Sequence, residues 1–323
     1  MSVAPSTKDK YQTHLLSYYT FCEKSNITPY PSAQQTLILF ATYLHKQNLS
    51  HQNINHHLAA IKYFSHVNGY DLELNSFSRL YRLLRGIKRT QGSQFRKPPR
   101  IPITPSLLTT LGRNLWNSSI DNSDKAMLWA AMLTAFYGFL RVSEYTSSHV
   151  KSFDPTTTLC YGDVTITSHS TINIHIKASK TDPFRVGVHI QVHRNNSTLC
   201  PFIALSHYLS HHPTKSGPLF TWHDRRYLTR RSLATVLTRI KPQYINNMSS
   251  HSFRIGAAST AAAAGLPRWL IQSLGRWTSN CYKDYIRIPT HTLEKVSLSL
   301  SSQPHNPCTP FDPDNVSSET INK

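Results

Sequence analysis

Two tyrosines near the end of the chain follow a short cationic segment. The stretch GRWTSNCYKDYIR carries Tyr282 and Tyr285 three positions apart, and the stretch HSFR precedes it. His251 and Arg254 in that second stretch are also three apart, so they share one face at the start of a predicted helix. Because a helix N-terminus favours a bound anion, this pair is well placed to bind a phosphate. A surface His and Arg would show the same pattern, so the spacing alone leaves the interpretation open.

Other phosphate and metal chemistries lack their residues in this sequence. It contains no Gly-rich phosphate loop, no dinucleotide fingerprint and no acidic residues spaced to bind magnesium. The adjacent pairs His56-His57 and His211-His212 point to different helix faces, which is typical of surface residues. The five cysteines are scattered and form no CxxC pair, so we expect reduced thiols and no zinc site. The sequence therefore predicts a protein that uses neither a metal nor another cofactor.

The net charge of the chain indicates its partner. Its 323 residues include 35 Lys and Arg but only 16 Asp and Glu, a formal net charge of +19. A surplus that large implies a polyanionic partner, with nucleic acid favoured and an anionic membrane surface second. No run approaches the roughly 18 apolar residues of a membrane span, and the N-terminus lacks an apolar signal core. We therefore expect an intracellular protein that is not inserted in a membrane.

Residues 1–90 are predicted to form four helices, the last of them basic. This helix runs from about Phe77 to Lys88, with apolar residues alternating with arginines at spacings of three, three and four. Such spacing places the cations in one stripe. A solvated face usually mixes both signs of charge, whereas no acidic residue lies between Glu73 and Asp121, so we expect phosphate contacts. DNA contacts are also predicted in the linker that follows and in a later basic cluster, although that cluster could be a plain basic surface. The predicted contacts are Arg79, Arg82, Arg85, Lys88, Arg89, Arg96, Lys97, Arg100, Arg230 and Arg231.

The rest of the chain is predicted to form a linker, a second domain and a tail. Residues 91–104 are polar, basic and proline-bearing, a composition typical of a linker. Residues 105–300 have mainly helical periodicity, but residues 164–192 alternate with a period of two and predict a small antiparallel sheet. Residues 292–300 are predicted to be a last short helix, packing on this domain or on a neighbouring subunit, and residues 301–323 a disordered tail. The predicted fold class is thus mainly α with a small antiparallel β-sheet: a helical N-terminal bundle followed by an α+β domain.

Five short motifs fall in an order that resembles a known family. The segments LRVSEY, SKTD, HSFR, GRW and YIR have separations similar to those of the tyrosine recombinase (phage integrase) family. The wording HSFRIGAAS, AAAAGLP and LGRWTS looks most like recombinases of eukaryotic mobile elements, the crypton and DIRS-type groups. The resemblance covers the whole catalytic half, and the helical N-terminal part looks like that family's SAM-like core-binding domain. Each motif alone is weak, but five in order are specific.

The resemblance implies roles for the cationic residues. Arg141 and Arg254 would bind the non-bridging oxygens of the scissile phosphate, a task that suits the planar and always charged guanidinium. They would stabilise the charge that develops in the transition state. Lys180, at a predicted hairpin tip, would protonate the leaving 5′-oxygen, and Lys177 is its rival for that role.

The resemblance also implies the nucleophile and its neighbours. His251 would be a base or phosphate ligand, and Glu144 would orient the cations. Trp277 stands where many relatives carry His; its indole donates one hydrogen bond but cannot shuttle a proton. Tyr285 would be the nucleophile because YIR matches the relatives, and a phenol of pKa near ~10 becomes competent beside several cations. Tyr285 lies eight residues after Trp277, one fewer than the commoner family spacing, and Tyr282 is the alternative that the sequence alone does not exclude.

The resemblance implies a recombinase or integrase that acts on double-stranded DNA. It would cut and rejoin strands through a covalent 3′-phosphotyrosyl intermediate, without metal or ATP, for integration or excision of a mobile element. It also implies a homotetramer on two DNA sites, acting in the nucleus of a eukaryotic host or otherwise in the cytoplasm with the DNA. Two alternatives stay open: strand swivelling like that of a type IB topoisomerase, and a captured DNA-binding protein without catalysis. The helical N-terminal domain argues against the first, and the complete set of motif residues, apart from the tryptophan exchange, argues against the second.

Overall fold

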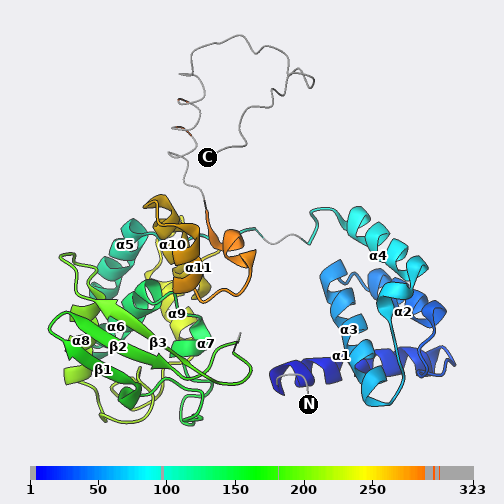
Figure 1. The fold of residues 1–323 in the computed structure, drawn as a ribbon, viewed down its shortest axis with the longest axis horizontal. Helices are drawn as coiled ribbons and strands as arrows, with labels where there is room; N and C mark the ends of the chain where they lie inside the picture. The colour runs from blue at the N-terminus through cyan, green and yellow to red at the C-terminus, as the bar shows by residue number, and fades with distance from the viewer. Residues whose placement is uncertain (1–4, 96–97, 181, 288–293, 295–297, 299–323) are drawn as a thin grey trace, which may run out of the picture. The chain divides into compact units, whose positions relative to one another are not determined.

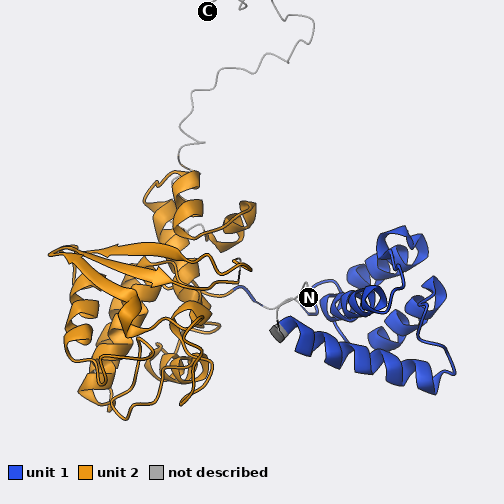
Figure 2. Ribbon diagram, turned by 60° about the horizontal axis from the view of Figure 1, so that its bottom comes forward, with its two compact units in different colours: residues 1–99 blue, residues 100–323 orange. Residues whose placement is uncertain are grey.

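The chain divides into two compact units, residues 1–99 and residues 100–323, which are described separately (Figure 2). The computed structural model describes residues 5–95, 98–180, 182–287, 294 and 298. Two predicted DNA contacts, Arg96 and Lys97, lie outside the described residues, as do the predicted tail and most of the predicted helix 292–300. None of the helices in the described ranges has both the length and the apolar composition needed to cross a membrane.

The first unit is built from four α-helices around an aromatic and aliphatic core. Tyr18, Leu37, Phe40, Ile54 and Ile61 are fully buried there, one or two from each of the first three helices. The helices are α1 (Pro5–Lys24), α2 (Gln34–Lys46), α3 (His51–Val67) and α4 (Ser78–Gln91), with a 3₁₀ turn η1 (Leu74–Ser76) before the last.

Helix α4 presents the predicted basic stripe to solvent. It turns Leu80 and Ile87 into the core, while the cations on the opposite face are all exposed. Its C-terminal end is held by the buried side chain of Gln91, which accepts a bond from the His51 amide (2.8 Å) and donates to the Leu49 carbonyl (2.8 Å). None of the ion pairs found among the described residues involves the five stripe cations, so their charge is available to a partner. They are Arg79, Arg82, Arg85, Lys88 and Arg89.

The second unit combines helices with one small antiparallel sheet, so the predicted fold class is confirmed (Figure 1). The strands pair in the order β1-β2-β3, and β2 turns Ile172, Ile174 and Ile176 into the core. The elements are α5 (Pro105–Trp116), α6 (Asn122–Tyr137), α7 (Val142–Tyr145), η2 (Tyr161–Asp163), β1 (Val164–Ser168), β2 (Thr171–Ile176), β3 (Val188–His193), α8 (Pro201–Ser210), α9 (Arg230–Ile240), α10 (His251–Ala263), α11 (Arg268–Leu274) and η3 (Asn280–Tyr285).

Helix α10 lies at the centre of this unit because its residues are small. Its run of Gly, Ala and Ser lets it pack closely against α6 and α11. At Gly256 the backbone of Ile103 approaches so closely that an added Cβ would lie 1.9 Å from the Ile103 carbonyl oxygen. The Ile103 amide also donates to the Ser252 carbonyl (3.0 Å), which fixes residues 100–103 beside the start of α10.

We predict that Gly256→Ala destabilises the second unit. Alanine gains roughly 0.5–1 kcal/mol over glycine in a helix interior, but displacing Ile103 is an overpacking change that costs roughly 1–3 kcal/mol. The clash should therefore win, by about 1–2 kcal/mol. All five tryptophans lie after residue 99, so tryptophan fluorescence during urea unfolding reports this unit alone. The control is Gly162→Ala, where nothing lies within 4 Å of the added Cβ; equal effects of the two changes would contradict the close approach.

Candidate active site around Tyr285

Arg254 is buried completely, although its guanidinium carries a permanent charge. Its two terminal nitrogens donate hydrogen bonds to the backbone carbonyls of Phe139 and Gly275. Burial, and then the charges of Arg141 and Arg276, lower the pKa of Arg254 to about 10. Arg254 therefore stays charged near neutral pH, with backbone oxygens in place of water.

The carbonyls that accept from Arg254 come from the C-terminal ends of two helices. Phe139 follows α6 with a φ of 50°, and the next amide, that of Leu140, returns to the Ala135 carbonyl (3.0 Å). Arg276 follows α11 with a φ of 53°, and the amide of Trp277 returns to the Gln272 carbonyl (3.0 Å). Left-handed residues end helices in this way, and they are seldom as large as these two. Helix C-termini carry a negative partial charge, so both ends favour a cation between them.

Arg276 is a buried cation that the sequence interpretation missed. One of its terminal nitrogens donates to Glu144 Oε2 (2.7 Å) and to the Phe139 carbonyl (3.3 Å), and the other to the Gly138 carbonyl (3.1 Å). Its side chain is only 13% exposed. The one hint in the sequence is its place in GRW, directly before a tryptophan assigned to the site, and that place does not distinguish a buried arginine from an exposed one.

Glu144 joins Arg276 to Arg141. Its Oε1 accepts from Arg141 Nη1 (2.9 Å), and its Oε2 also accepts from the Arg141 backbone amide (2.9 Å). The carboxylate side chain is fully buried. We call Arg141, Glu144, Arg254 and Arg276 the arginine cluster. With three guanidiniums and one carboxylate it carries a net charge of +2, and such an excess in a buried place is costly without an anion.

Two aromatic rings lie against the guanidinium of Arg254, and His251 lies against one of them. The guanidinium lies 4.3 Å from the centre of the Trp277 ring and 5.6 Å from that of Tyr285. The Tyr285 ring lies 4.8 Å from Trp277 and 5.1 Å from His251, measured between ring centres. The indole Nε1 of Trp277 is buried and has no hydrogen-bond partner among the described residues. Four sequence-predicted residues thus come together at one point, and the rings cover the arginine.

Tyr282 and Tyr285 lie in different surroundings although both belong to η3. Tyr282 is 4% exposed, part of the hydrophobic core, with its ring 6.5 Å from that of Trp277. Tyr285 is only partly buried, at the end of η3. The hydroxyl of Ser259 holds this end, because it donates to the Tyr285 carbonyl (3.2 Å) and accepts from the Arg287 amide (2.9 Å). Of these two tyrosines, Tyr285 is the one whose ring contacts both His251 and Arg254.

His251 is the first residue of α10 and faces several cations. Burial, and then the charges of Arg100, Arg254, Arg141 and Arg230, lower its pKa to about 4. The imidazole is therefore neutral near neutral pH and able to accept a proton. Arg100 and Arg230, both predicted DNA contacts, are exposed and lie at the edge of the site, whereas Arg231, also exposed, acts less on His251 than these two.

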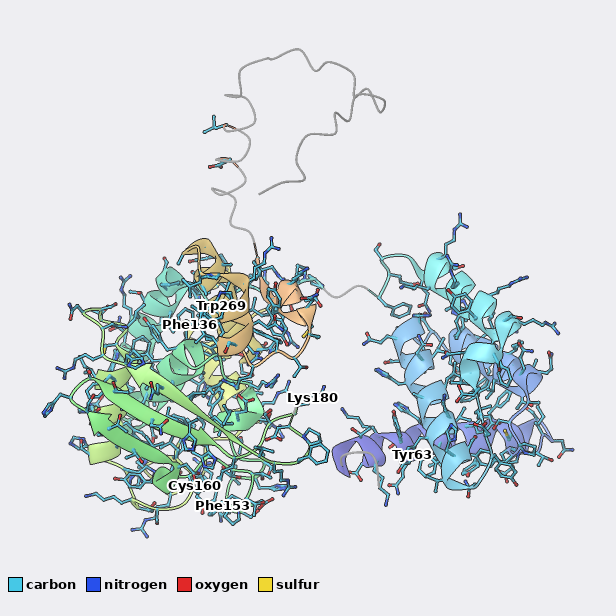
Figure 3. The ribbon with its side chains drawn as sticks, in the orientation of Figure 1. Tyr63, Phe136, Phe153, Cys160, Lys180 and Trp269 are labelled. Atoms are coloured by element: carbon cyan, nitrogen blue, oxygen red, sulfur yellow. The ribbon has the colours of Figure 1, made fainter. Side chains whose placement is uncertain are left out.

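Lys180 stands apart from the arginine cluster. It is exposed on the connection between β2 and β3 (Figure 3), and no contact among the described residues joins it to Tyr285 or the arginines. Its rival Lys177 is engaged elsewhere, since its ammonium group pairs with Asp163 Oδ2 at 2.7 Å.

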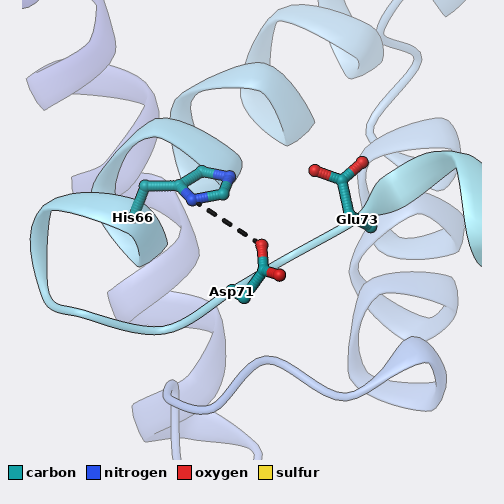
Figure 4. Close-up of side chains that lie close together, drawn as sticks. All are labelled: His66, Asp71 and Glu73. Carbon is teal, nitrogen blue, oxygen red and sulfur yellow. Dashed lines mark ion pairs between the residues drawn. The ribbon is translucent and has the colours of Figure 1, made fainter.

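Two groups of acidic and histidine side chains lie close together outside this site. His66, Asp71 and Glu73 form one in the first unit (Figure 4), and Asp121, Asp124 and His223 form the other. Ion pairs account for both: His66 pairs with Asp71 (3.8 Å), Glu73 with Lys62 (2.9 Å) and His223 with Asp124 (2.7 Å). Neither group includes a residue of the arginine cluster.

We predict that His251 stays neutral down to a pH well below its ordinary pKa of 6.5. The unfolded chain then binds more protons than the folded one, so stability falls as the pH drops from 6.5 towards 4. In NMR titrations of histidine-labelled protein, the His251 resonance is the one that is missing from the variant His251→Gln. This resonance should titrate near pH 4. Arg100→Gln should raise that midpoint, and Arg231→Gln, which removes an exposed charge with a smaller effect on His251, should change it less. A midpoint near 6.5 would contradict the described surroundings.

Comparisons with known proteins identify the fold. No protein-family model matches the sequence, and no curated protein matches it. Several solved structures do match. The structure of XerH site-specific recombinase bound to palindromic difH substrate, a post-cleavage complex, matches over 91% of this chain and 79% of that one, with 15% identity and a TM-score of 0.60. The Tn1549 transposon integrase with transposon right end DNA matches over 93% and 95% (12% identity, TM-score 0.59). A lambda integrase dimer bound to a COC′ core site matches over 88% and 73% (11% identity, TM-score 0.50). The chain therefore has the fold of the recombinases and integrases that its five motifs resemble.

Proposed function

We propose that this chain is a tyrosine recombinase that cuts and rejoins double-stranded DNA. The observation that carries this proposal is the contact of one partly buried tyrosine, Tyr285, with a histidine, an indole and a buried arginine. The phenol oxygen attacks the scissile phosphorus, the bond to the 5′-oxygen breaks, and a 3′-phosphotyrosyl ester remains. The neutral imidazole of His251 takes the phenolic proton, and Lys180 protonates the leaving 5′-oxygen.

The arginine cluster supplies the positive charge for this reaction. A phosphodiester brings one negative charge and gains more in the transition state, which matches the net charge of +2 on the cluster. Arg141 and Arg254 bind the non-bridging oxygens, and the unpartnered indole N–H of Trp277 adds a neutral donor. Glu144 contacts Arg141 directly, and Arg276 acts on Arg141 through Glu144.

Binding of the phosphate and release of the nucleophile are coupled in this proposal. The rings of Trp277 and Tyr285 cover Arg254, so a phosphate reaches the guanidinium only when the Tyr285 ring moves aside. That movement also frees the phenol from its packing. The bond between Ser259 and the Tyr285 carbonyl holds the backbone of η3 meanwhile, so a rotation of the side chain is sufficient.

Exposed cations of both units would hold the DNA backbone. The stripe on α4 offers five of them without acidic partners among the described residues, and the second unit separately offers the exposed Arg100, Arg230 and Arg231. These contacts position the duplex and carry no sequence information.

We further propose a mobile-element role and a homotetramer on two duplexes. The wording of the motifs resembles crypton and DIRS-type recombinases, and one of the matching structures is a transposon integrase with transposon end DNA. Exchange between two duplexes needs four cut strands, hence four nucleophiles, and in a eukaryotic host it takes place in the nucleus. A relaxation assay on a supercoiled plasmid separates this from monomeric swivelling, which needs no second site.

We predict a covalent DNA adduct that depends on Tyr285. A duplex is first selected from a random-sequence library by binding to the full chain, and nicked versions of it are then incubated with protein and run on a denaturing gel. Wild type should form the adduct, Tyr285→Phe should lose it, and Tyr282→Phe should keep it because Tyr282 packs in the core. An adduct that survives Tyr285→Phe would move the nucleophile elsewhere. Absence of any adduct on the selected duplex would favour a DNA-binding protein without catalysis.

We predict that Arg276 supports phosphate neutralisation through Glu144. Without Arg276 the carboxylate would draw Arg141 away from the phosphate, so Arg276→Gln should slow cleavage by roughly tenfold to a hundredfold, somewhat less than direct loss of a donor. On a substrate with a neutral methylphosphonate at the scissile position, less charge has to be neutralised, and the defect should shrink. A merely structural lesion would slow both substrates equally. Arg276→Lys, which keeps a charge next to Glu144, should restore part of the rate.

A further inference from the structure

The connection between β2 and β3 exposes two large apolar side chains at its tip. Phe184 is 88% exposed, the largest value among the exposed large hydrophobic side chains of the described residues, and Val186 is 81% exposed. Exposing such groups costs free energy, and a loop tip can easily carry polar residues instead. The tip, residues 182–187, therefore calls for a partner that covers it.

The tip is held in shape by the carboxylate of Asp182. Its two oxygens accept from the backbone amides of Val186 (3.1 Å) and Gly187 (2.8 Å), and its carbonyl accepts from the Arg185 amide (3.3 Å). The chain reverses at Gly187, whose φ is 75° and whose added Cβ would lie 2.7 Å from Nε2 of His175. Phe184 is thus presented outward by an ordered turn.

The charges around the tip indicate the partner. Asp182 keeps its negative charge while the amides of its own turn hold it, so Lys180 and Arg185, which flank Phe184, leave the tip with a net charge of +1. The side chain of Arg185 reaches the segment that precedes η2, since its Nη1 donates to Thr156 Oγ1 at 3.2 Å. An apolar side chain between cations is suited to a stack of bases between phosphates.

We propose that Phe184 inserts as a wedge at a base step of the bound duplex and unstacks it. The inference rests on the proposed function, because the same loop carries Lys180, which protonates the 5′-oxygen there. Phe184 follows Lys180 by four residues, so its Cα lies within about 14 Å of the lysine Cα. At about 3.4 Å per base step, this Cα separation corresponds to about four steps, which sets the range around the cleaved phosphate in which the wedge is sought. Val186 packs beside the displaced base, and Lys180 and Arg185 bind the flanking phosphates. Unstacking at this place loosens the strand end that must leave and be exchanged.

The test places 2-aminopurine, whose fluorescence rises on unstacking, singly at each of the four steps on either side of the cleavage position in the selected duplex. Wild-type protein should raise the fluorescence severalfold at one step. Phe184→Ala should abolish the rise and change DNA affinity less than threefold, since the flanking cations remain. Phe184→Leu, which keeps an apolar wedge, should retain part of the rise. The matched control is Trp269→Ala, which removes another exposed aromatic side chain of the same unit (69% exposed; Figure 3) and should leave the rise intact.

Two outcomes would overturn the wedge: a fluorescence rise that survives Phe184→Ala, or no rise at any step with wild type. A change in sedimentation of the DNA-free protein on Phe184→Ala, with the rise intact, would assign the tip to contacts between copies instead. The adduct assay separates this inference from the proposed function. If wild type forms the adduct without any fluorescence rise, the wedge alone fails. If the wedge is correct, Phe184→Ala and wild type should give the same adduct yield on a duplex whose bases at the inserted step are mismatched and therefore already unstacked.

Discussion

The burial of Arg254 is the constraint on which the rest of the site depends. A guanidinium with no solvent exposure must find its partners inside the protein, because an unpaired buried charge is strongly destabilising. Here the carbonyls of Phe139 and Gly275 provide them, at the ends of α6 and α11. Both helices end in a large residue with left-handed backbone, a conformation that glycine would adopt more easily. The strain is tolerated because these turns bring the negative ends of two helices to one cation.

The same constraint explains why α10 is made of small residues. Arg254 reaches both helix ends only if α10 approaches α6, α11 and residues 100–103 closely, and Gly256 permits an approach that any side chain would block. A second arginine, Arg276, then shares the Phe139 carbonyl with Arg254 and shares Glu144 with Arg141. The three arginines are therefore one connected unit, and each depends on the placement of the others.

The sequence predicted much of this arrangement, for identifiable reasons. Helical periodicity located the main helices and alternation located the sheet, since both patterns record which side chains face the core. The ordered motifs predicted that Arg254, His251 and Tyr285 would meet, and they do. The role of Arg276 was not predictable, because it depends on a left-handed turn that no residue type announces. Nor was the difference between Tyr282 and Tyr285, since residues three apart in a 3₁₀-helix lie on the same side, and only their burial in the folded chain separates them.

The covering of Arg254 by aromatic rings has a consequence for how the proposed enzyme would be controlled. Without DNA, the Trp277 and Tyr285 rings give the guanidinium a weak cation–π partner in place of an anion. A phosphate is a far stronger partner, so it displaces the ring, whereas water or a neutral group gains too little to do so. The phenol is then released only where a phosphodiester is present to be attacked. In the proposed reaction, a nucleophile held against its own charge cluster is exposed together with its substrate, and the +2 charge of the cluster favours the phosphate that opens the site.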